Sequence, residues 1–457
     1  MRRPLAFSHG FIRVRHWAFV ASGDRSAQYV AGGCRVRSPE TDLRRMFDAA
    51  LAAADPMRCL SSFLPPPPKG RTVVVGAGKA AASMAAAVEA HWSTPLSGLV
   101  ITRYGHGAAT RHIEVVEAAH PVPDANGVEA TARLLASLEN LTSDDLVLCL
   151  LSGGGSALLV APPPGVLLDD KQALIRALLL SGAPISEINC VRKHLSLVKG
   201  GRLRQAVGPA RLLTLAISDV PGDDPQFIAS GPTVADMTTR AQAEAILRRY
   251  DIVPTPAVAS WLANPASEHS AGVAFAEGRF ELVAAPGLSL EAAAKAASGL
   301  GYEPIILGDA IEGEARDVAR AHAVLARCLS HGLQPGDRPL MLLSGGETTV
   351  TVVGRGRGGR NTEYLLALGL ALDGEASIFA LAADTDGIDG REDNAGAILR
   401  PTSLSEAAER GALGADYLAD NDAYGFFDLS GDLLFTGPTL TNVNDFRAIA
   451  ILPPARR

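Results

Sequence analysis

A chain of 457 residues is too long for one ordinary hydrophobic core, so we expect two or three domains. Its formal net charge of −7 argues against a general nucleic-acid binder, because the chain lacks the excess of cations that would neutralise many phosphates. Hydrophobic residues make up 47% of the chain and aromatic residues only 5%, a balance typical of α/β proteins with parallel strands buried on both faces.

The cysteines and the apolar runs indicate the compartment. The five cysteines are widely spaced and form no CxxC pair, so they predict neither a disulfide framework nor a structural zinc site. The apolar stretch of residues 147–168 is interrupted by glycines and prolines and predicts no membrane span. We therefore expect a cytoplasmic protein in a reducing compartment.

Residues 1–38 differ from the rest of the chain. They contain seven arginines and one aspartate, and their apolar residues follow no regular period. An arginine-rich transit peptide is one interpretation. We favour a start codon placed too far upstream, and we expect this extension to be poorly ordered.

Strands and helices then alternate along the first part of the chain. A helix is predicted from Glu40, and the expected strands lie at residues 71–75, 98–102, 145–151 and 211–217. Helical patterns at residues 80–91, 134–138, 171–180 and 185–197 lie between these strands. The alternation predicts a doubly wound, mainly parallel sheet.

A second α/β set follows a junction at residues 251–278, which is rich in proline and alanine. Its first strand is expected at residues 281–284. We place the boundary near residue 275, which gives one domain at 39–275 and a second region at 276–457.

The stretch of residues 340–368 carries the strongest local signal. It has an apolar strand at 340–343, a β-branched run at 348–353 that predicts a second strand, and a glycine-rich loop at 354–361. Three arginines lie on this loop, and a helix is predicted from Thr362 with Asn361 as its N-cap. Glycines allow close backbone approach to an anion, and arginine matches phosphate or carboxylate geometry, so we predict an anion site here rather than a flexible basic loop.

The loops at the carboxyl ends of the predicted strands carry the other candidate residues. In a doubly wound sheet ligands bind at this edge. Gly76-x-Gly78-x-x-Ala81 fits the dinucleotide fingerprint only loosely, and Arg103 after the next strand leaves NADP open. Lys79 begins a helix, where a cation is unfavourable unless an anion binds beside it. A solvated lysine on a turn is the alternative interpretation.

Three more groups of residues complete the candidate site. The loop of Ser152, Gly153, Gly154, Gly155 and Ser156 is predicted to hold phosphate through backbone N–H groups.

Asn189, Arg192 and Lys193 lie at helical spacing, so together they can reach one ligand, unless they form only a basic helix face. Asp219, Asp384 and Asp386 are candidates to supply oxygens to Mg²⁺, or are ordinary acidic turns.

Taken together, these pieces resemble the two-domain glycerate 2-kinase family, whose C-terminal part is called the MOFRL domain. The matching stretches in the first part are residues 76–80, 120–121, 151–157, 189–194, 217–220 and 230–233. Those in the second part are residues 344–348, 358–361, 384–387 and 437–445. The family pattern has glycine where this chain has Leu440. A leucine would be strained at a positive φ, so either its φ is ordinary or this last loop differs locally.

The resemblance implies a Rossmann-like N-terminal domain and a smaller α/β region that contains the MOFRL domain at about residues 336–450. It also implies ATP-dependent phosphorylation of D-glycerate at the 2-hydroxyl with Mg²⁺, in a cleft between two domains. Lys79 and Arg360 match the positions proposed as catalytic in the family. Substrate or nucleotide binding is expected at Gly76, Gly78, Ser152–Ser156, Asn189, Arg192, Lys193, Gly345, Gly346, Glu347, Arg357 and Asn361.

Two other functions stay open at this point. The first is an NAD(P)H-dependent hydroxypyruvate reductase, a name that some family members carry. The second is a small-anion sensor without catalytic activity. We expect D-glycerate and ATP as partners, with neither nucleic acid nor membrane, and the oligomeric state stays open, a homodimer included.

The position of Lys79 and Arg360 on glycine-rich loops leads to one further expectation. Because neither lies on an apolar face, replacing either with alanine should lower kcat far more than it lowers stability.

Overall fold

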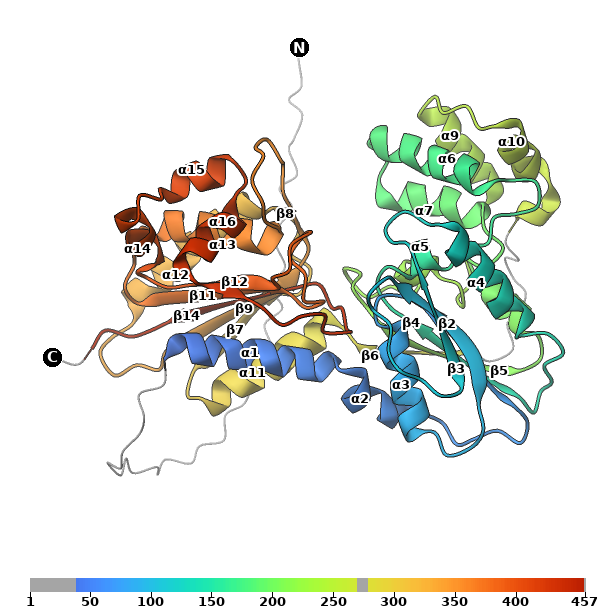
Figure 1. Ribbon diagram of the computed structural model, residues 1–457, viewed down its shortest axis with the longest axis horizontal. Helices are drawn as coiled ribbons and strands as arrows, with labels where there is room; N and C mark the ends of the chain where they lie inside the picture. Colours follow the sequence, from blue (N-terminus) through green and yellow to red (C-terminus); the bar gives the residue numbers. More distant parts are fainter. Residues whose placement is uncertain (1–37, 269–277, 456–457) are drawn as a thin grey trace, which may run out of the picture. The chain divides into compact units, whose positions relative to one another are not determined.

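The computed structural model describes residues 38–268 and 278–455 (Figure 1). The predicted extension therefore lies outside the described residues, apart from Ser38. This serine caps helix α1 (Pro39–Ala54) by accepting a hydrogen bond from the backbone N–H of Thr41. A short helix α2 (Pro56–Cys59) and a 3₁₀ turn (Leu60–Phe63) then connect α1 to the first sheet.

The first sheet has six strands, all parallel, in the order β3-β2-β1-β4-β5-β6. The strands are β1 (Thr72–Ala77), β2 (Ser97–Arg103), β3 (Ile113–Ala118), β4 (Leu146–Leu151), β5 (Arg211–Ile217) and β6 (Gly278–Ala284). This strand order is that of a Rossmann fold, which confirms the predicted doubly wound sheet.

Helices cover both faces of the first sheet because successive strand residues point to opposite sides. Val74 and Leu148 pack with α3 (Ala81–His91), whereas Val73 and Val147 pack with α4 (Ala125–Ala136) and α8 (Arg202–Val207). Burial of both faces explains why these strands have nearly continuous apolar sequences.

A group of four helices with its own core is inserted between β4 and β5 and between β5 and β6 (Figure 1). It consists of α6 (Leu168–Leu180), α7 (Ile185–His194), α9 (Arg240–Arg249) and α10 (Pro256–Ala263). Its core contains Leu178, Val191, Leu247 and Trp261. We call this set the helical group.

The second sheet is mixed and has the order β13-β12-β11-β14-β9-β7. Its strands are β7 (Glu303–Gly308), β9 (Leu340–Gly346), β11 (Ile378–Asp384), β12 (Gly396–Leu399), β13 (Leu433–Leu434) and β14 (Asp445–Ile451). Only β7 and β9 are parallel, and β14 runs antiparallel to both of its neighbours, β9 and β11.

The second sheet is also covered on both faces. Helices α12 (Ala315–Gly332) and α13 (Arg360–Leu372) pack on one face, and α1 and α11 (Pro286–Gly299) pack on the other. The remaining helices of this region are α14 (Ser403–Glu409), α15 (Gly414–Ala419) and α16 (Ala423–Ser430). The α/β fold class expected from the sequence is therefore confirmed for the described residues.

Three elements differ from the sequence-based expectations. The strand expected at residues 281–284 to open the second α/β set is part of β6, which pairs with β5 in the first sheet. Helix α1 precedes the first sheet in the chain, yet it packs on the second sheet through Phe47 and Met46. The β-branched run at 348–353 forms only the two-residue strand β10 (Thr348–Thr349), which pairs with β8 (Gly313–Glu314). Val352 and Val353 are exposed, and no strand of the described residues pairs with them. The division of the chain into domains stays a prediction.

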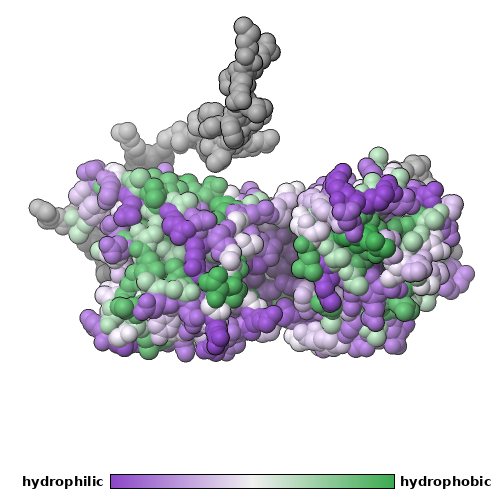
Figure 2. All heavy atoms as spheres, turned by 90° about the horizontal axis from the view of Figure 1, so that it is seen from above, coloured by the Kyte–Doolittle hydropathy of each residue, from purple (hydrophilic) through white to green (hydrophobic). Residues whose placement is uncertain are grey.

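The surface drawn in Figure 2 mixes hydrophilic and hydrophobic residues, as is usual for a folded chain. Among the described residues, no helix has both the length and the apolar character needed to cross a membrane.

The packing of α1 on the second sheet leads to a stability prediction. Phe47 is 1% exposed, and its ring lies 5.7 Å from that of Phe446 in β14, measured between centroids. We expect Phe47→Ala to lower the free energy of unfolding by about 3–5 kcal/mol through lost contacts and a residual cavity. Urea denaturation measures this, and Arg44→Ala on the exposed side of α1 is the control. Equal midpoints for the two variants would contradict the packing.

Candidate functional site

Two glycine-containing loops meet at the carboxyl edge of the first sheet. Strands β1 and β4 are parallel neighbours, and their last residues, Ala77 and Leu151, are paired, so the loops that follow them lie side by side. The backbone N–H of Lys79 donates to the carbonyl of Gly153 over 2.8 Å, and that of Ala80 donates to Oγ of Ser152 over 2.9 Å. These bonds fix Lys79 at the sheet edge.

A side chain at Gly153 would collide with a neighbouring carboxylate. A Cβ atom at this position would lie 1.8 Å from Oδ2 of Asp219, which follows β5 at the same edge. The Asp219 carboxylate accepts a hydrogen bond of 2.9 Å from Nδ2 of Asn442. Asn442 belongs to the segment 437–445 that leads into β14, so this segment connects the edges of the two sheets.

The edge of the second sheet gathers carboxylates because β14 runs antiparallel between β9 and β11. Its first residue, Asp445, therefore pairs with the last residues of both neighbours, Gly346 and Asp384. Glu347 follows directly after β9. Three carboxylates, those of Asp384, Asp445 and Glu347, thus converge at one edge.

Arg360 binds all three carboxylates. Its guanidinium donates from Nε to Asp445 over 2.7 Å, from Nη1 to Glu347 over 2.6 Å and from Nη2 to Asp384 over 2.9 Å. These bonds use three of the five N–H donors of an arginine. The arginine is the first residue of α13, and 23% of its side chain is exposed.

The start of α13 is capped by a residue that lies elsewhere in the sequence. The helix begins at Arg360, with Gly359 rather than the predicted Asn361 as its N-cap. Asp389 accepts hydrogen bonds from the backbone N–H groups of Asn361 and Thr362 over 3.0 and 2.9 Å. Asn361 therefore lies inside the helix, and its Nδ2 donates to Asp445 over 2.8 Å.

Lys79 links the first edge to the second. Its Nζ lies 2.8 Å from Oδ2 of Asp386, and Nη1 of Arg103 lies 3.9 Å from the same oxygen. The backbone N–H of Asp386 in turn donates to Asp384 over 3.0 Å. Lys79 and Arg360 therefore bind two aspartates of the same loop, although they are 281 positions apart in the sequence.

The segment 437–445 makes a further contact with the first sheet region. Leu440 has a φ of 59°, in the left-handed region that favours glycine, and its carbonyl accepts a hydrogen bond from Oγ of Ser83 in α3. The φ of Leu440 is therefore not ordinary, which was one of the two possibilities that the sequence left open.

The charges of the site act strongly on one another. Burial acts to lower the pKa of Lys79, but Asp386 and Asp384 act more strongly in the other direction, so the pKa is raised. Burial raises the pKa of Asp219 to about 6, and it also raises that of Asp384, with a further contribution from Asp386. Burial acts to raise the pKa of Asp386, but Lys79 and the backbone hydrogen bond from Ile388 act together in the other direction, so the pKa is lowered. Burial acts to lower the pKa of Arg360 too, but Asp445, Asp384 and Glu347 together raise it. Lys79 and Arg360 therefore keep their charge at neutral pH, whereas the aspartates differ in their affinity for protons.

The predicted metal ligands have the right chemistry but not a closed cage. Carboxylate oxygens suit Mg²⁺, which usually takes one or two of them together with substrate phosphates and water. Asp386 and Asp384 are engaged by Lys79 and Arg360, and Asp219 is engaged by Asn442. Within the described part of the chain, no group of three or more His, Cys, Asp or Glu side chains is arranged to hold a metal by itself.

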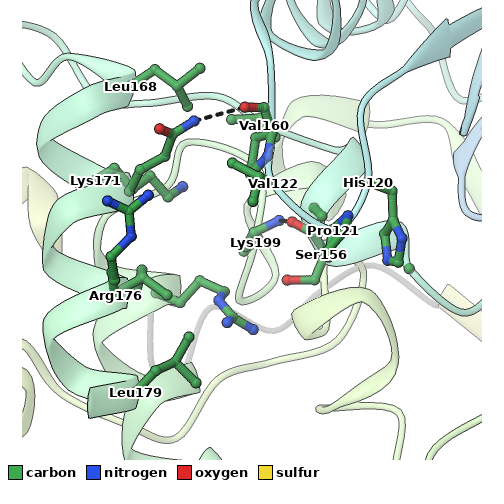
Figure 3. A pocket seen from close by; sticks show the side chains of 16 residues that line it. His120, Pro121, Val122, Ser156, Val160, Leu168, Lys171, Arg176, Leu179 and Lys199 are labelled. Atoms are coloured by element: carbon green, nitrogen blue, oxygen red, sulfur yellow. Dashed lines mark hydrogen bonds between the residues drawn. The ribbon is translucent and has the colours of Figure 1, made fainter. Parts of the chain in front are cut away.

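A cavity of about 420 Å³ lies between the helical group and the loops after β3 and β4 (Figure 3). Lys171, Arg176 and Leu179 of α6 line one side, and His120, Val122 and Ser156 line the other. Arg192 and Gly154 also line it, so the predicted residues of α7 and of the second glycine loop share one space. A Cβ atom on Gly154 would lie 3.4 Å from Cγ of Lys79 and 2.9 Å from the His120 ring, which places the Gly154 wall beside Lys79.

Some predicted site residues lie elsewhere. Lys193 is buried and pairs with Asp236 over 3.3 Å. Its neighbour Arg192, by contrast, lines the cavity and donates a hydrogen bond of 2.8 Å to Oδ1 of Asn189. Arg357 lies 3.5 Å from Glu392 and stacks over the Tyr424 ring. It does not contact the carboxylates that Arg360 binds, so the arginines of the glycine-rich loop do not act as one cluster.

Gly346 is required by packing. Its φ is +115°, and a Cβ atom there would lie 2.2 Å from the backbone nitrogen of Ile311. Gly345, next to it, offers its carbonyl to Nη1 of Arg447 over 3.3 Å.

Four residues near these edges and the cavity were not predicted from the sequence. Asp445, Asn442, Asp389 and Lys171 were not among the predicted site residues. The Thr-Asn-Val-Asn-Asp run at 441–445 contained a usable signal, since polar residues directly before a strand often mark a functional edge. Lys171 gave no signal, because an isolated lysine in a helix usually faces solvent.

Comparisons with known proteins agree on one family. Residues 42–263 match a domain of unknown function named DUF4147, and residues 340–445 match the MOFRL family. A D-glycerate 2-kinase of Thermotoga maritima is 39% identical over 398 residues, which cover 87% of this chain and 94% of that protein. The chain belongs to the glycerate 2-kinase family.

A solved structure and a further relative of this family extend the comparison. The crystal structure of a glycerate kinase from Thermotoga maritima matches with a TM-score of 0.83 and 37% identity, and the match covers 91% of this chain and all of the other. An Agrobacterium vitis protein is 52% identical over 437 residues, which cover 94% of this chain and 99% of the relative. That relative carries the provisional name hydroxypyruvate reductase. Both names used within the family therefore appear among the relatives.

The capping of α13 gives a prediction about the position of Arg360. Asp389→Ala leaves two backbone N–H groups at the start of α13 without their acceptor, so we expect a loss of about 1–3 kcal/mol in the free energy of unfolding. Denaturant unfolding measures it, with Asp416→Ala at an exposed position of α15 as the control. If the two variants were equally stable, Asp389 would not be the cap.

The burial of Lys171 gives a prediction about pH. Burial, with a smaller effect of Arg192, lowers the pKa of Lys171 to about 7. Between about pH 7 and 10 the unfolded lysine binds a proton that the folded one has lost, so stability rises with pH. We therefore expect the free energy of unfolding of the wild type to increase over this range relative to Lys171→Met. Parallel pH profiles of the two proteins would contradict the shift.

Proposed function

We propose that this protein transfers the γ-phosphoryl group of ATP to the 2-hydroxyl of D-glycerate and releases 2-phosphoglycerate. Membership of the glycerate 2-kinase family supports this activity. The observation that carries it is the convergence of Lys79 and Arg360, from the edges of two different sheets, on Asp386 and Asp384 of one loop.

The two cations suit the demands of phosphoryl transfer. The transferred group has a loose transition state whose charge is spread over its oxygens, so catalysis depends on positioned positive charge. We assign Lys79 and Arg360 to the phosphoryl group that moves between ATP and glycerate. Arg360 can keep its carboxylate contacts while its remaining N–H donors bind the substrate.

The carboxylates would hold Mg²⁺ together with the nucleotide. Asp219, Asp384 and Asp386 offer the oxygens, and a bound Mg²⁺ would neutralise charge on the phosphates. Until substrate binds, Lys79 and Arg360 occupy two of these carboxylates, which keeps the buried charges paired.

The glycine loops complete this assignment. Gly76 and Gly78 allow β1 to lie close to the neighbouring strand and loop, since a Cβ atom at Gly78 would lie 2.1 Å from Oγ of Ser152. We assign the loop Ser152–Ser156 to phosphate binding beside Lys79. Glu347 orients Arg360 through its 2.6 Å bond.

A reductase is the second candidate function, favoured by the name of the Agrobacterium vitis relative. Its structural basis in this chain is weak. The arginine that would read a 2′-phosphate, Arg103, faces Asp386 at 3.9 Å rather than an open site. The acid-rich edge around Asp384 would also repel the phosphates of a dinucleotide unless Mg²⁺ accompanies them.

One experiment separates the candidate functions. Purified protein is mixed with D-glycerate, ATP and Mg²⁺ and assayed for ADP, while a parallel sample follows NADPH absorbance with hydroxypyruvate. The kinase predicts ADP formation that depends on D-glycerate, and product analysis should give 2-phosphoglycerate rather than 3-phosphoglycerate. NADPH oxidation without ADP would assign the reductase, and ligand-induced thermal stabilisation without either turnover would favour the sensor.

The roles of the two cations are tested by conservative variants. Arg360→Ala leaves three carboxylates without their cation. We therefore expect it to lower the free energy of unfolding by about 3–5 kcal/mol, contrary to the expectation from the sequence that its loss spares stability. Arg360→Lys keeps the positive charge but loses the planar guanidinium group with its several N–H donors. We expect Arg360→Lys and Lys79→Met each to lower kcat about a hundred-fold or more.

Arg357→Ala is the matched control, because Arg357 lies on the same loop but pairs with Glu392. Its kcat should stay close to that of the wild type. A near-normal kcat for Arg360→Lys together with a strong loss for Arg357→Ala would exchange the roles of the two arginines.

A further inference from the structure

One buried lysine lacks the partner that a buried cation normally has. Lys171 is 6% exposed, and its Nζ has no hydrogen-bond partner among the described residues. It points from α6 into the cavity that the helical group forms with the loops after β3 and β4 (Figure 3). Buried charges are usually paired, and a negative charge beside this amine would favour its charged form, so the unpartnered Lys171 indicates an anion that binds in the cavity.

The neighbouring cations Lys199 and Arg192 differ from Lys171 because both have hydrogen-bond partners. Nζ of Lys199 is satisfied by the carbonyls of Ser156 and Leu159 over 2.8 and 2.7 Å, so this lysine supports the loop. Arg192 is held by Asn189 and also lines the cavity. No Asp or Glu occurs among the described residues that line it. Arg176, an exposed residue, is the fourth cation of the lining, so cations dominate the charged groups of the cavity, and Lys171 is the buried one without a hydrogen-bond partner.

Much of the remaining wall is apolar. Val122 and Leu179 are 54% and 58% exposed, and with Ile175 they give the cavity an uncovered hydrophobic surface. A volume of about 420 Å³ is far larger than glycerate needs, and glycerate has no apolar part that could use these walls. Ligand pockets of this size, with mostly apolar walls and a few placed cations, suit a nucleotide.

We propose that this cavity binds the adenine nucleotide, with Lys171 and Arg192 on the phosphate chain and Val122, Ile175 and Leu179 against the base. The assignment rests on the proposed kinase function and gives it a nucleotide site. It places the phosphate chain along the Gly154 wall, beside Lys79. D-glycerate then binds to the N–H donors of Arg360 that its carboxylate contacts leave free.

The direct test measures ADP binding by calorimetry with the full chain in the absence of glycerate. Lys171→Met keeps the length of the side chain and removes its charge. Lys295→Met, on the exposed side of α11, makes the same chemical change elsewhere. We expect Lys171→Met to weaken ADP about tenfold or more, the usual effect of losing a hydrogen bond to a charged group, and Lys295→Met to bind like the wild type.

Steady-state kinetics give a second measurement that a merely structural role would not reproduce. Lys171→Met should raise KM for ATP by a similar factor while KM for D-glycerate stays within about twofold. The variant should fold, since it removes a buried charge. Ile175→Trp, which narrows the cavity without changing charge, should also raise KM for ATP.

The possible results distinguish a failure of the nucleotide assignment from a failure of the proposed kinase reaction. Unchanged ADP affinity in Lys171→Met, or a rise only in KM for D-glycerate, would overturn the nucleotide assignment even if the wild type makes ADP from ATP and glycerate. If the wild type binds ADP through Lys171 but forms no product with D-glycerate, the nucleotide site stands and the proposed kinase reaction fails.

Discussion

The site depends on the pairing of Arg360 with carboxylates that the second sheet brings together. Because β14 runs antiparallel between β9 and β11, Asp445 starts where its neighbours end, and Asp384 and Glu347 lie beside it. Several carboxylates so close together would repel one another without a cation. Arg360 supplies it from the first residue of α13, and Asp389 holds that helix in place. Packing, charge and backbone capping thus specify one position for one guanidinium.

The first sheet contributes the other half of the site, again because neighbouring strands end at the same edge. Parallel β1, β4 and β5 finish at one edge, so Lys79, Ser152 and Asp219 lie close together without being close in the sequence. The segment 437–445 then joins the two edges through Asn442. These contacts are accompanied by backbone strain at Leu440, whose φ is in the left-handed region.

Much of this arrangement could be predicted from the sequence, and the exceptions have physical reasons. Apolar strands that alternate with helices predicted the first sheet, and the family motifs marked Lys79, Asp384 and Arg360. The place of α1 was not predictable, because an amphipathic helix does not specify which sheet it covers. Asp389 and Lys171 were missed because a cap from a distant loop and a buried unpaired cation leave no local pattern.

The central claim is that Lys79 and Arg360 act on the same phosphoryl group. A double-mutant cycle on kcat/KM, with Lys79→Met, Arg360→Lys and the combined variant, tests it most directly. The account predicts strong coupling, so that the combined variant loses far less activity than the product of the two single losses. Losses that simply multiply would contradict a shared site and would assign the two cations to separate tasks.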